Sequence, residues 1–310
     1  MPKVSMMNAA MIADVALLTD SRYLQRKPED QYVSNIFLED DILTEALNEQ
    51  GISALRVSWD DPHFDWSSVR LVLFRTPWDY FFRYPEFSKW IATVSGQTRL
   101  VNPPALINWN IDKRYLRDLQ QKGIRIPPTV FVEKGEKQSL PELFHQQQWS
   151  EGIIKPVVGG AARHTYRFGT SDLNEVSGLF SSLIDEEAML LQEYQPSIIS
   201  RGEVAFMVMN GKFTHAVLKK AKAGDFRVQD DFGGTLHDYQ ATAEEIAFAE
   251  NVVKHCPEFP LYARVDVMWD NAGNPCVSEL EVIEPELWFR RHPSSADVLA
   301  EGIVNLLSAQ

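Results

Sequence analysis

A β-hairpin is predicted near the C-terminal end of the chain by the stretch Arg264-Val265-Asp266-Val267-Met268-Trp269-Asp270-Asn271-Ala272-Gly273-Asn274-Pro275-Cys276-Val277-Ser278-Glu279-Leu280-Glu281. Its two β-like runs, residues 261–269 and 275–283, flank residues 271–274, which are expected to form a four-residue loop. That loop pairs Asp270 with Pro275, and the same register sets Asp266 opposite Glu279. The sequence therefore predicts two neighbouring strands that carry acids at matching positions.

Three carboxylates are expected on one face of this hairpin. Glu279 and Glu281 are two positions apart on a strand, so their side chains project from the same face, beside Asp266. Such a cluster is unfavourable unless a cation neutralises it, and an all-oxygen set suits a hard ion such as Mg²⁺. A solvated strand face with unrelated acids is the alternative. The apolar neighbours favour a sheet whose other face is packed: Val265, Val267, Leu280 and Val282.

A second feature lies upstream, where Lys155 ends a β-like run and Pro156-Val157-Val158-Gly159-Gly160-Ala161-Ala162 follows. A loop of small residues lets backbone N–H groups approach phosphate oxygens, and the lysine supplies a positive charge. The alternative is an ordinary turn after a surface lysine. The pattern therefore indicates a candidate phosphate-binding loop.

The rest of the chain predicts a mixed fold, α/β followed by α+β. Residues 11–102 alternate short strands with amphipathic helices, which is typical of a parallel α/β domain. The Pro103-Pro104 pair marks a turn into a small α+β lid, residues 103–188, in which Asn110 caps a helix over residues 111–122. Residues 189–310 are mainly β, with Asn210-Gly211 as a hairpin turn, and predict an antiparallel sheet.

Composition narrows the classes of partner. The 310 residues include 30 basic and 43 acidic side chains, a net charge of −13 that opposes general binding to nucleic acid or to an anionic membrane. Residues 6–18 form an apolar run too short to span a bilayer. Only Cys256 and Cys276 occur, so no disulfide framework is expected and a cytoplasmic location is predicted.

In their order along the chain, these motifs resemble the ATP-grasp superfamily over residues 102–310, with the preceding α/β domain in the expected place. The resemblance implies an ATP-grasp fold with a central lid and a C-terminal sheet. It also implies nucleotide contacts from two phosphate-binding lysines, a covering loop, an adenine hinge and a ribose-binding acid: Lys113, Lys155, Gly159, Gly160, Ala161, Gln192, Glu193, Tyr194 and Glu203.

The resemblance extends to the metal motif. In that superfamily an acid on one strand and Glu-x-Asn, or a variant, on the next hold the ion, and Asp266, Glu279 and Glu281 match this motif by order and spacing. Glu281 stands where Asn is common, which adds negative charge at the third ligand. The implied cofactors are ATP and Mg²⁺, two ions by resemblance, with Mn²⁺ as a substitute.

A narrower resemblance connects the chain with the cycloserine-synthetase-like and glutathione-synthetase-like branch, whose known cycloserine member closes a ring in O-ureido-serine at the expense of ATP. Five stretches carry it: Arg75-Thr76-Pro77-Trp78-Asp79-Tyr80 with Glu86-Phe87 and Trp90, Arg201-Gly202-Glu203, Thr214-His215-Ala216-Val217 with Lys219, Asp225-Phe226-Arg227-Val228-Gln229, and Glu279-Leu280-Glu281 continuing to Glu284-Pro285.

Arg75 follows an apolar strand, residues 71–74, and is expected at the carboxyl end of the sheet, where open α/β folds place ligands. With Trp78, Asp79 and Tyr80 it forms a candidate substrate wall, since arginine suits a carboxylate. A structural aromatic corner with a paired arginine is the alternative.

Three further cations are candidate catalytic residues. Arg264 shares a strand face with Asp266, Lys219 ends a strand, and Arg227 lies in a glycine-containing loop. Each can reach a transferred phosphate if it lies beside the metal acids. Surface ion pairing is the alternative for each.

The predicted function is an ATP-dependent ligase that phosphorylates a carboxylate-type oxygen of an amino-acid-like substrate and joins it to a nitrogen nucleophile. The nitrogen belongs either to a second molecule or, in a cyclo-ligase, to the same one. The alternatives are a non-catalytic ATP-binding regulatory module and a glutathione-synthetase-like, peptide-forming ligase. Relatives of this superfamily are often dimers or tetramers, so a homodimer is a further hypothesis.

Overall fold

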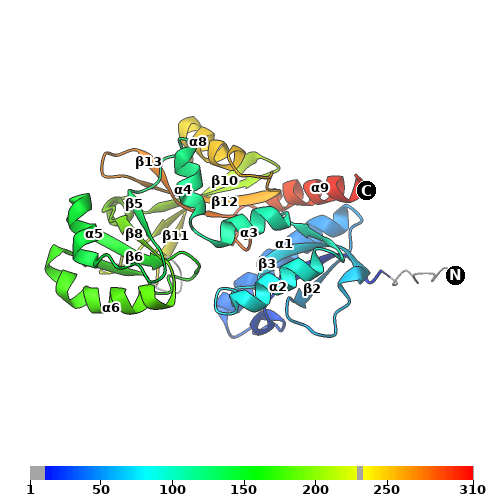
Figure 1. Ribbon diagram of the computed structural model, residues 1–310. Coiled ribbons are helices and arrows are strands. Elements are labelled where there is room, and N and C mark those ends of the chain that lie inside the picture. Colours follow the sequence, from blue (N-terminus) through cyan, green and yellow to red (C-terminus); the bar gives the residue numbers. More distant parts are fainter. Residues whose placement is uncertain (1–10, 229–232, 310) are drawn as a thin grey trace.

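The protein contains three β-sheets, each with its own helices (Figure 1). The computed structural model describes residues 11–228 and 233–309. Gln229, quoted above in one of the resembling stretches, lies outside the described residues. No helix in these two ranges has the length and apolar character needed to cross a bilayer.

Sheet A is parallel and has the strand order β2-β1-β3-β4. Alternate side chains of β1 and β3 enter two different cores. Val15 and Leu71 pack with helix α1, whereas Ala16 and Val72 pack with helix α2, so the helices cover opposite faces. The elements are β1 (Ala13–Thr19), α1 (Gln31–Glu49), β2 (Ala54–Ser58), β3 (Val69–Thr76), α2 (Tyr84–Val94) and β4 (Arg99–Val101), with short 3₁₀ turns at Ser21–Tyr23 and Trp66–Ser68.

Sheet B forms the lid and is antiparallel, in the order β5-β8-β6-β7. Its elements are β5 (Thr129–Val132), α5 (Leu140–Gln147), β6 (Glu151–Pro156), β7 (Tyr166–Gly169), a 3₁₀ turn (Thr170–Asp172), α6 (Leu173–Glu186) and β8 (Met189–Glu193). β8 was assigned above to the C-terminal unit, yet it pairs with β5 and β6. The lid sheet therefore extends beyond residue 188.

Sheet C is antiparallel, in the order β11-β10-β9-β12-β13. Helix α8 covers one face, against Val204 and Val265, and helix α9 covers the other, against Ala205 and Met207. The elements are α7 (Ser197–Ser200), β9 (Glu203–Met209), β10 (Lys212–Lys220), β11 (Thr235–Tyr239), α8 (Ala243–Lys254), β12 (Tyr262–Trp269), β13 (Pro275–Glu281) and α9 (Ser294–Ser308). The predicted mixed fold, with a parallel N-terminal sheet and an antiparallel C-terminal sheet, is confirmed.

Of the predicted helix over residues 111–122, helix α4 (Tyr115–Gln121) forms, whereas residues 112–114 are a break that follows an earlier helix, α3 (Pro104–Ile111). Asn110 is not a cap. Its buried amide donates to the carbonyl of Leu280 (2.8 Å) and accepts from the N–H of Val282 (3.1 Å), which ties α3 to β13. The break between the helices contains Lys113, whose N–H donates to the carbonyl of Val157 (2.7 Å).

Candidate active site

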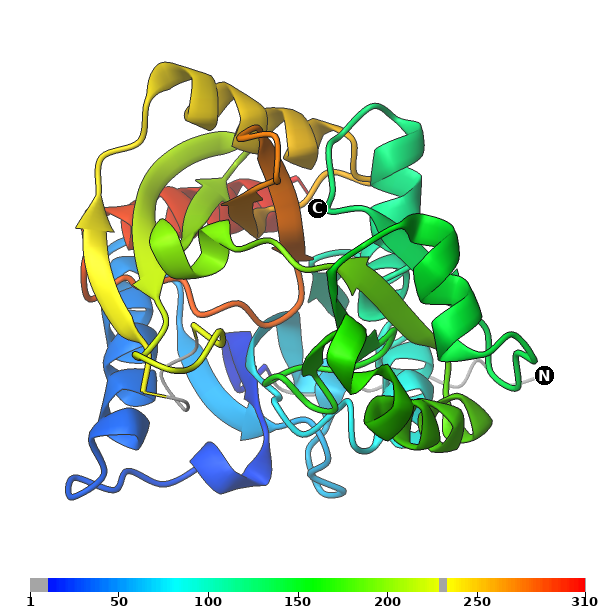
Figure 2. The same cartoon turned by 90° about the vertical axis from the view of Figure 1, so that its left-hand side faces the viewer.

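A single cavity of about 400 Å³ brings the three sheets together. Figure 2 shows sheet C, the lid sheet and the N-terminal domain arranged around this region. All predicted site residues line it except Arg75 and Asp79. Those lining it are Trp78, Tyr80, Lys113, Lys155, Gly159, Gly160, Ala161, Gln192, Glu193, Tyr194, Glu203, Lys219, Arg227, Arg264, Asp266, Glu279 and Glu281.

The acids on β12 and β13 lie in the predicted register, but for a different reason. Trp269, not Asp270, pairs with Pro275, so the loop is one residue longer than predicted. A bulge between Val267 and Asp266 then restores the pairing of Asp266 with Glu279. The longer loop shifts the pairing of the two strands by one residue. The bulge, an extra residue in β13, shifts it back, so that Asp266 lies opposite Glu279 as predicted.

The bulged strand carries Ser278, a residue that the sequence reading missed. Its hydroxyl lies 2.5 Å from the Glu203 carboxylate and 3.0 Å from the carbonyl oxygen of Asp266. It thereby connects β13 to β9. Regular alternation places Ser278 on the opposite face from Glu279, so only knowledge of the bulge could have placed it here.

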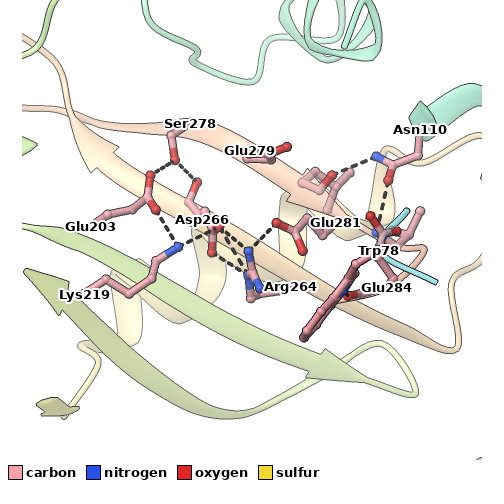
Figure 3. A network of polar contacts seen from close by, with 12 residues as sticks. Trp78, Asn110, Glu203, Lys219, Arg264, Asp266, Ser278, Glu279, Glu281 and Glu284 are labelled. Atoms are coloured by element: carbon pink, nitrogen blue, oxygen red, sulfur yellow. Dashed lines mark hydrogen bonds and ion pairs between the residues drawn. The ribbon is translucent and has the colours of Figure 1, made fainter. Parts of the chain in front are cut away.

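A chain of alternating charges crosses the sheet (Figure 3). Lys219 lies 2.5 Å from Glu203 and 2.8 Å from Asp266. Arg264 lies 2.9 Å from Asp266 and also pairs with Glu281. Although burial raises it, these two cations hold the pKa of Asp266 below its usual value. Burial raises the pKa of Glu281, and the neighbouring carboxylates of Glu279 and Asp266 act in the same direction, whereas Arg264 opposes them.

Two lysines approach from the other side of the cavity. Lys113, in the break between α3 and α4, donates to the carboxylate of Glu279 (2.5 Å) and to the carbonyl of Gly159 (2.9 Å). Lys155 is on β6 and has no ion pair in the part of the chain that the structure describes. Burial lowers the pKa of Lys155 to about 8, and the neighbouring Lys113 acts in the same direction.

The small-residue loop lies against the N-terminal domain. A Cβ atom at Gly160 would come within 2.9 Å of the Phe81 ring, so only glycine permits this approach. Ala161 and Ala162 have φ values of 48° and 53°, in the left-handed region that L-residues rarely adopt. The loop is therefore held in a costly conformation above the cavity.

At the predicted adenine hinge, much of the hydrogen bonding is internal to the protein. The side chain of Gln192 donates to the Thr129 hydroxyl (2.8 Å), and the N–H groups of Glu193 and Tyr194 donate to carbonyls of the lid. Apolar side chains flank the hinge, as a flat aromatic base requires: Ile153, Ile198, Phe226 and Met268. The role of Gln192, Glu193 and Tyr194 in binding adenine stays a prediction.

The predicted substrate wall divides into two pairs. Trp78 and Tyr80 line the cavity, whereas Arg75 is 3% exposed and pairs with Asp40 of α1 at 2.9 Å. Asp79 accepts from the indole of Trp59 (2.7 Å) and pairs with Arg83 (3.1 Å). Arg75 and Asp79 therefore fit the alternative reading, a structural corner and not a substrate wall, because both side chains form ion pairs within the N-terminal domain.

The third catalytic candidate, Arg227, lines the cavity from the loop before β11. Its guanidinium lies 2.7 Å from the carboxylate of Asp225. The role of Arg227 in phosphoryl transfer stays a prediction.

The predicted metal ligands match magnesium in chemistry but not in their present arrangement. Asp266, Glu279 and Glu281 supply only oxygen atoms, as Mg²⁺ prefers. Among the described residues, however, no three acidic, histidine or cysteine side chains are grouped to hold an ion. The carboxylates point to Lys113, Lys219 and Arg264 instead. Metal binding therefore requires these ion pairs to open.

A lid sheet and a C-terminal sheet that enclose lysines on one side and an Asp, Glu-x-Glu motif on the other define an ATP-grasp protein. Sequence comparison agrees. Residues 15–102 match the family described as D-cycloserine synthetase DcsG, N-terminal domain, and residues 120–272 match prokaryotic glutathione synthetase, ATP-grasp domain.

Individual relatives narrow the class. The cycloserine biosynthesis protein DcsG of Streptomyces lavendulae is 32% identical over 260 residues, which cover 79% of this chain and 86% of that protein. A probable alpha-L-glutamate ligase of Maridesulfovibrio salexigens is 28% identical over 191 residues, 58% of each chain. The crystal structure of D-cycloserine synthetase DcsG superposes with a TM-score of 0.83 at 28% identity, over 95% of this chain and all of that one.

More distant structures share the fold. D-alanine–D-alanine ligase from Bacillus anthracis, complexed with ATP, has a TM-score of 0.64 at 15% identity, over 94% of this chain and 96% of that one. The chain belongs to the ATP-grasp family that includes DcsG. It is an ATP-dependent ligase that forms C–N bonds, and enzymes of this class use ATP with Mg²⁺.

Proposed function

We propose that this ligase phosphorylates a carboxylate-type oxygen of an amino-acid-like small molecule and then joins the activated carbon to a nitrogen atom. One observation carries the proposal. Cations from three separate elements, Lys113, Lys219 and Arg264, converge with the acids of β12 and β13 in one cavity. This is the charge arrangement that a triphosphate and its metal ions require.

In the first step, the substrate oxygen attacks the γ-phosphorus of ATP. The bond from that phosphorus to its bridging oxygen breaks, and ADP leaves with the electron pair. We assign Lys113 and Lys155 to the phosphates from the lid side, and Lys219, Arg227 and Arg264 to the transferred group from the sheet side. Such transfer depends on positioning and charge neutralisation, so no covalent help from the protein is needed.

Asp266, Glu279 and Glu281 are the proposed ligands for Mg²⁺, two ions by analogy with the superfamily, with Mn²⁺ as a substitute. Bound there, the metal would neutralise phosphate charge. The protein's own contribution is to hold the carboxylates on adjacent strands, with Ser278 fixing the bulge between them.

In the second step, nitrogen attacks the acyl carbon and phosphate leaves. The intermediate is sensitive to water, and the loop of Gly159, Gly160 and Ala161 lies where it could cover it. The match of residues 15–102 to the DcsG N-terminal domain favours a nucleophile within the same molecule, that is, a cyclo-ligase. The glutathione-synthetase match of the ATP-grasp domain favours the peptide-forming alternative.

The test is ADP release with a panel of amino acids and amines, followed by mass spectrometry of the product. A product with atoms of one substrate indicates ring closure, and a product with atoms of two indicates intermolecular ligation. ADP release that never depends on an added acceptor would contradict the proposal.

The regulatory alternative makes a different prediction. For a ligase, Glu279→Ala and Glu281→Ala should abolish turnover and leave adenine binding largely intact. If these variants instead lose only the binding of a partner protein, the chain is a regulatory module.

We also propose residues 11–102, 103–188 and 189–310 as the N-terminal, lid and C-terminal domains, except that strand β8, residues 189–193, belongs to the lid sheet. A cytoplasmic location, a homodimer and the absence of a nucleic-acid partner stay predictions. Light scattering coupled to gel filtration tests the dimer.

A further inference from the structure

The cavity continues beyond the metal acids into the loop that follows β13. Four glutamates lie on β13 and this loop, and all four line the cavity: Glu279, Glu281, Glu284 and Glu286. Three of them pair with cations, namely with Lys113, Arg264 and Arg290. Glu284 differs, because no cation of the described chain lies within ion-pair distance of its carboxylate.

Glu284 lies against the aromatic residues that follow β3 in the N-terminal domain, Trp78 and Tyr80. The indole N–H of Trp78 donates to the main-chain oxygen of Glu284 at 3.0 Å, and the nearby hydroxyl of Tyr80 acts to lower the pKa of the Glu284 carboxyl group. Figure 3 shows Glu284 and Trp78 at one end of the row of acids, with Glu203 at the other end. The main chain at Glu284 is therefore held by a neutral donor. Lys113 acts on the carboxylate electrostatically, but it forms its ion pair with Glu279 and not with Glu284.

The loop itself is strained and firmly anchored. Trp288 lines the cavity, is 3% exposed, and has a φ of 49°, a conformation that is rare for a bulky side chain. Its indole N–H has no hydrogen-bond partner in the described part of the chain. Glu39 of α1 accepts from the N–H groups of Phe289 (2.7 Å) and Arg290 (3.1 Å) and thereby holds the loop. Strain of this kind, fixed from outside, is typical of ligand-binding loops.

We propose that Glu284 binds the ammonium group of the substrate and so selects amino acids over acids that lack the amine. The inference rests on the proposed function, since it assigns one end of the substrate to the cavity in which phosphoryl transfer occurs. An ammonium group supplies the missing positive charge and up to three N–H donors. The rings of Tyr23, Tyr32 and Trp78 pack against one another and line the same cavity, and Arg22 already lies over the Tyr23 ring, 5.2 Å from its centroid.

The electrostatics of the cavity also bear on this assignment. Burial raises the pKa of Glu284 to about 7, although Tyr80 and Lys113 act to lower it, and nearby Glu279 acts in the same direction as burial. A cationic group bound beside Glu284 would reverse this effect and stabilise the ionised carboxylate.

The test compares matched pairs of compounds that differ only in the α-amine: serine with 3-hydroxypropanoate, alanine with propanoate, and O-ureido-serine with its desamino analogue. Binding is measured by titration in the presence of Mg²⁺ and a non-hydrolysable ATP analogue, and turnover is measured separately as ADP release. In the wild-type protein the amino member should bind about 10- to 100-fold more tightly, the range for a hydrogen-bonded charge pair.

The variant is Glu284→Gln, which keeps an acceptor for the Tyr80 hydroxyl and removes the charge. It should lose most of the preference for the amine and retain its affinity for ATP. The control is Glu245→Gln. Glu245 is also half-buried and accepts from a tyrosine hydroxyl, that of Tyr239 (2.8 Å), but it lies outside the cavity.

The outcomes separate the two claims. Equal binding of both members, with normal turnover, overturns the ammonium site and leaves the ligase function standing. Selective binding that depends on Glu284, without any ADP release, supports the ammonium site and overturns the ligase function. If no member of either series binds, both claims are contradicted.

Discussion

The ammonium of Lys113 and the carboxylate of Glu279 form an ion pair of 2.5 Å between residues 166 positions apart in the chain. The lysine lies in a helix break and the glutamate on β13. If Lys113 binds phosphate and Glu279 binds metal, each has to release the other when the nucleotide arrives. The ion pair then competes with the nucleotide. Substitution of Glu279 and substitution of Lys113 should therefore change the affinity for metal-free ATP in different directions.

The Glu279→Gln substitution frees Lys113 and should leave metal-free ATP binding unchanged or make it tighter. Lys113→Gln removes a phosphate contact and should weaken metal-free ATP binding about tenfold or more. Both variants should lose turnover. Titration with ATP in the presence of EDTA measures the affinities. A purely structural ion pair predicts instead that both variants bind ATP more weakly and unfold at similarly reduced temperatures.

The affinity of metal-free ATP should fall as the pH rises through about 8. Burial lowers the pKa of Lys155 to about 8, so the side chain is mostly cationic at pH 7 and mostly neutral at pH 9. Phosphate stabilises the cationic form, and binding near pH 8 should therefore take up protons. Calorimetry in two buffers of different ionisation enthalpy measures this uptake.

Lys155→Arg is the matched comparison, because arginine keeps its charge over this range. The variant should take up fewer protons than the wild type and hold its affinity for ATP from pH 7 to pH 9. Identical proton uptake by the two proteins would show that another group is responsible.

The sequence allowed most of the cavity lining to be predicted, since the order of lysines, glycines and acids along the chain is itself informative. The predictions from sequence were wrong at places where the backbone departs from regular helix or strand geometry. Residues 111–122 read as one helix, because nothing in the local pattern marks the break that places Lys113 beside Glu279. Likewise, the bulge at β13 depends on contacts of Ser278 with other strands.

The substrate wall shows a different limit. An arginine at the carboxyl end of a strand is available to bind a ligand only when no acidic side chain of the protein forms an ion pair with it. Asp40, from a helix 35 positions earlier in the chain, lies 2.9 Å from Arg75. A pairing between elements so far apart in sequence depends on how α1 packs on the sheet, which a single sequence does not reveal.

The contact between the glycine loop and the N-terminal domain should control how tightly ATP use is coupled to ligation. Gly160→Ala places a methyl group 2.9 Å from the Phe81 ring and should separate the loop from it. We expect more ADP release without acceptor, because water then reaches the site. Phe81→Ala should have a similar effect, and the double variant should be no worse than either single one. Additive effects would show that the two residues act independently.

Gly202, which precedes Glu203, should be essential for stability. Its φ is +87°, and a Cβ there would collide with the main-chain oxygen of Lys219 on the neighbouring strand. Gly202→Ala must therefore displace β10 exactly where Lys219 meets Glu203, besides the cost of about 1–2 kcal/mol for a left-handed alanine.

Gly123→Ala is the control for the backbone cost alone, because Gly123 has a φ of +85° and nothing within 4 Å of its Cβ position. Thermal unfolding should show a clearly larger loss for Gly202→Ala, by about 1–3 kcal/mol, the usual range for overpacking. The same variant should bind ATP more weakly, since Glu203 and Lys219 both line the cavity. Equal destabilisation by the two substitutions would mean that β10 adjusts to the added methyl group at little cost.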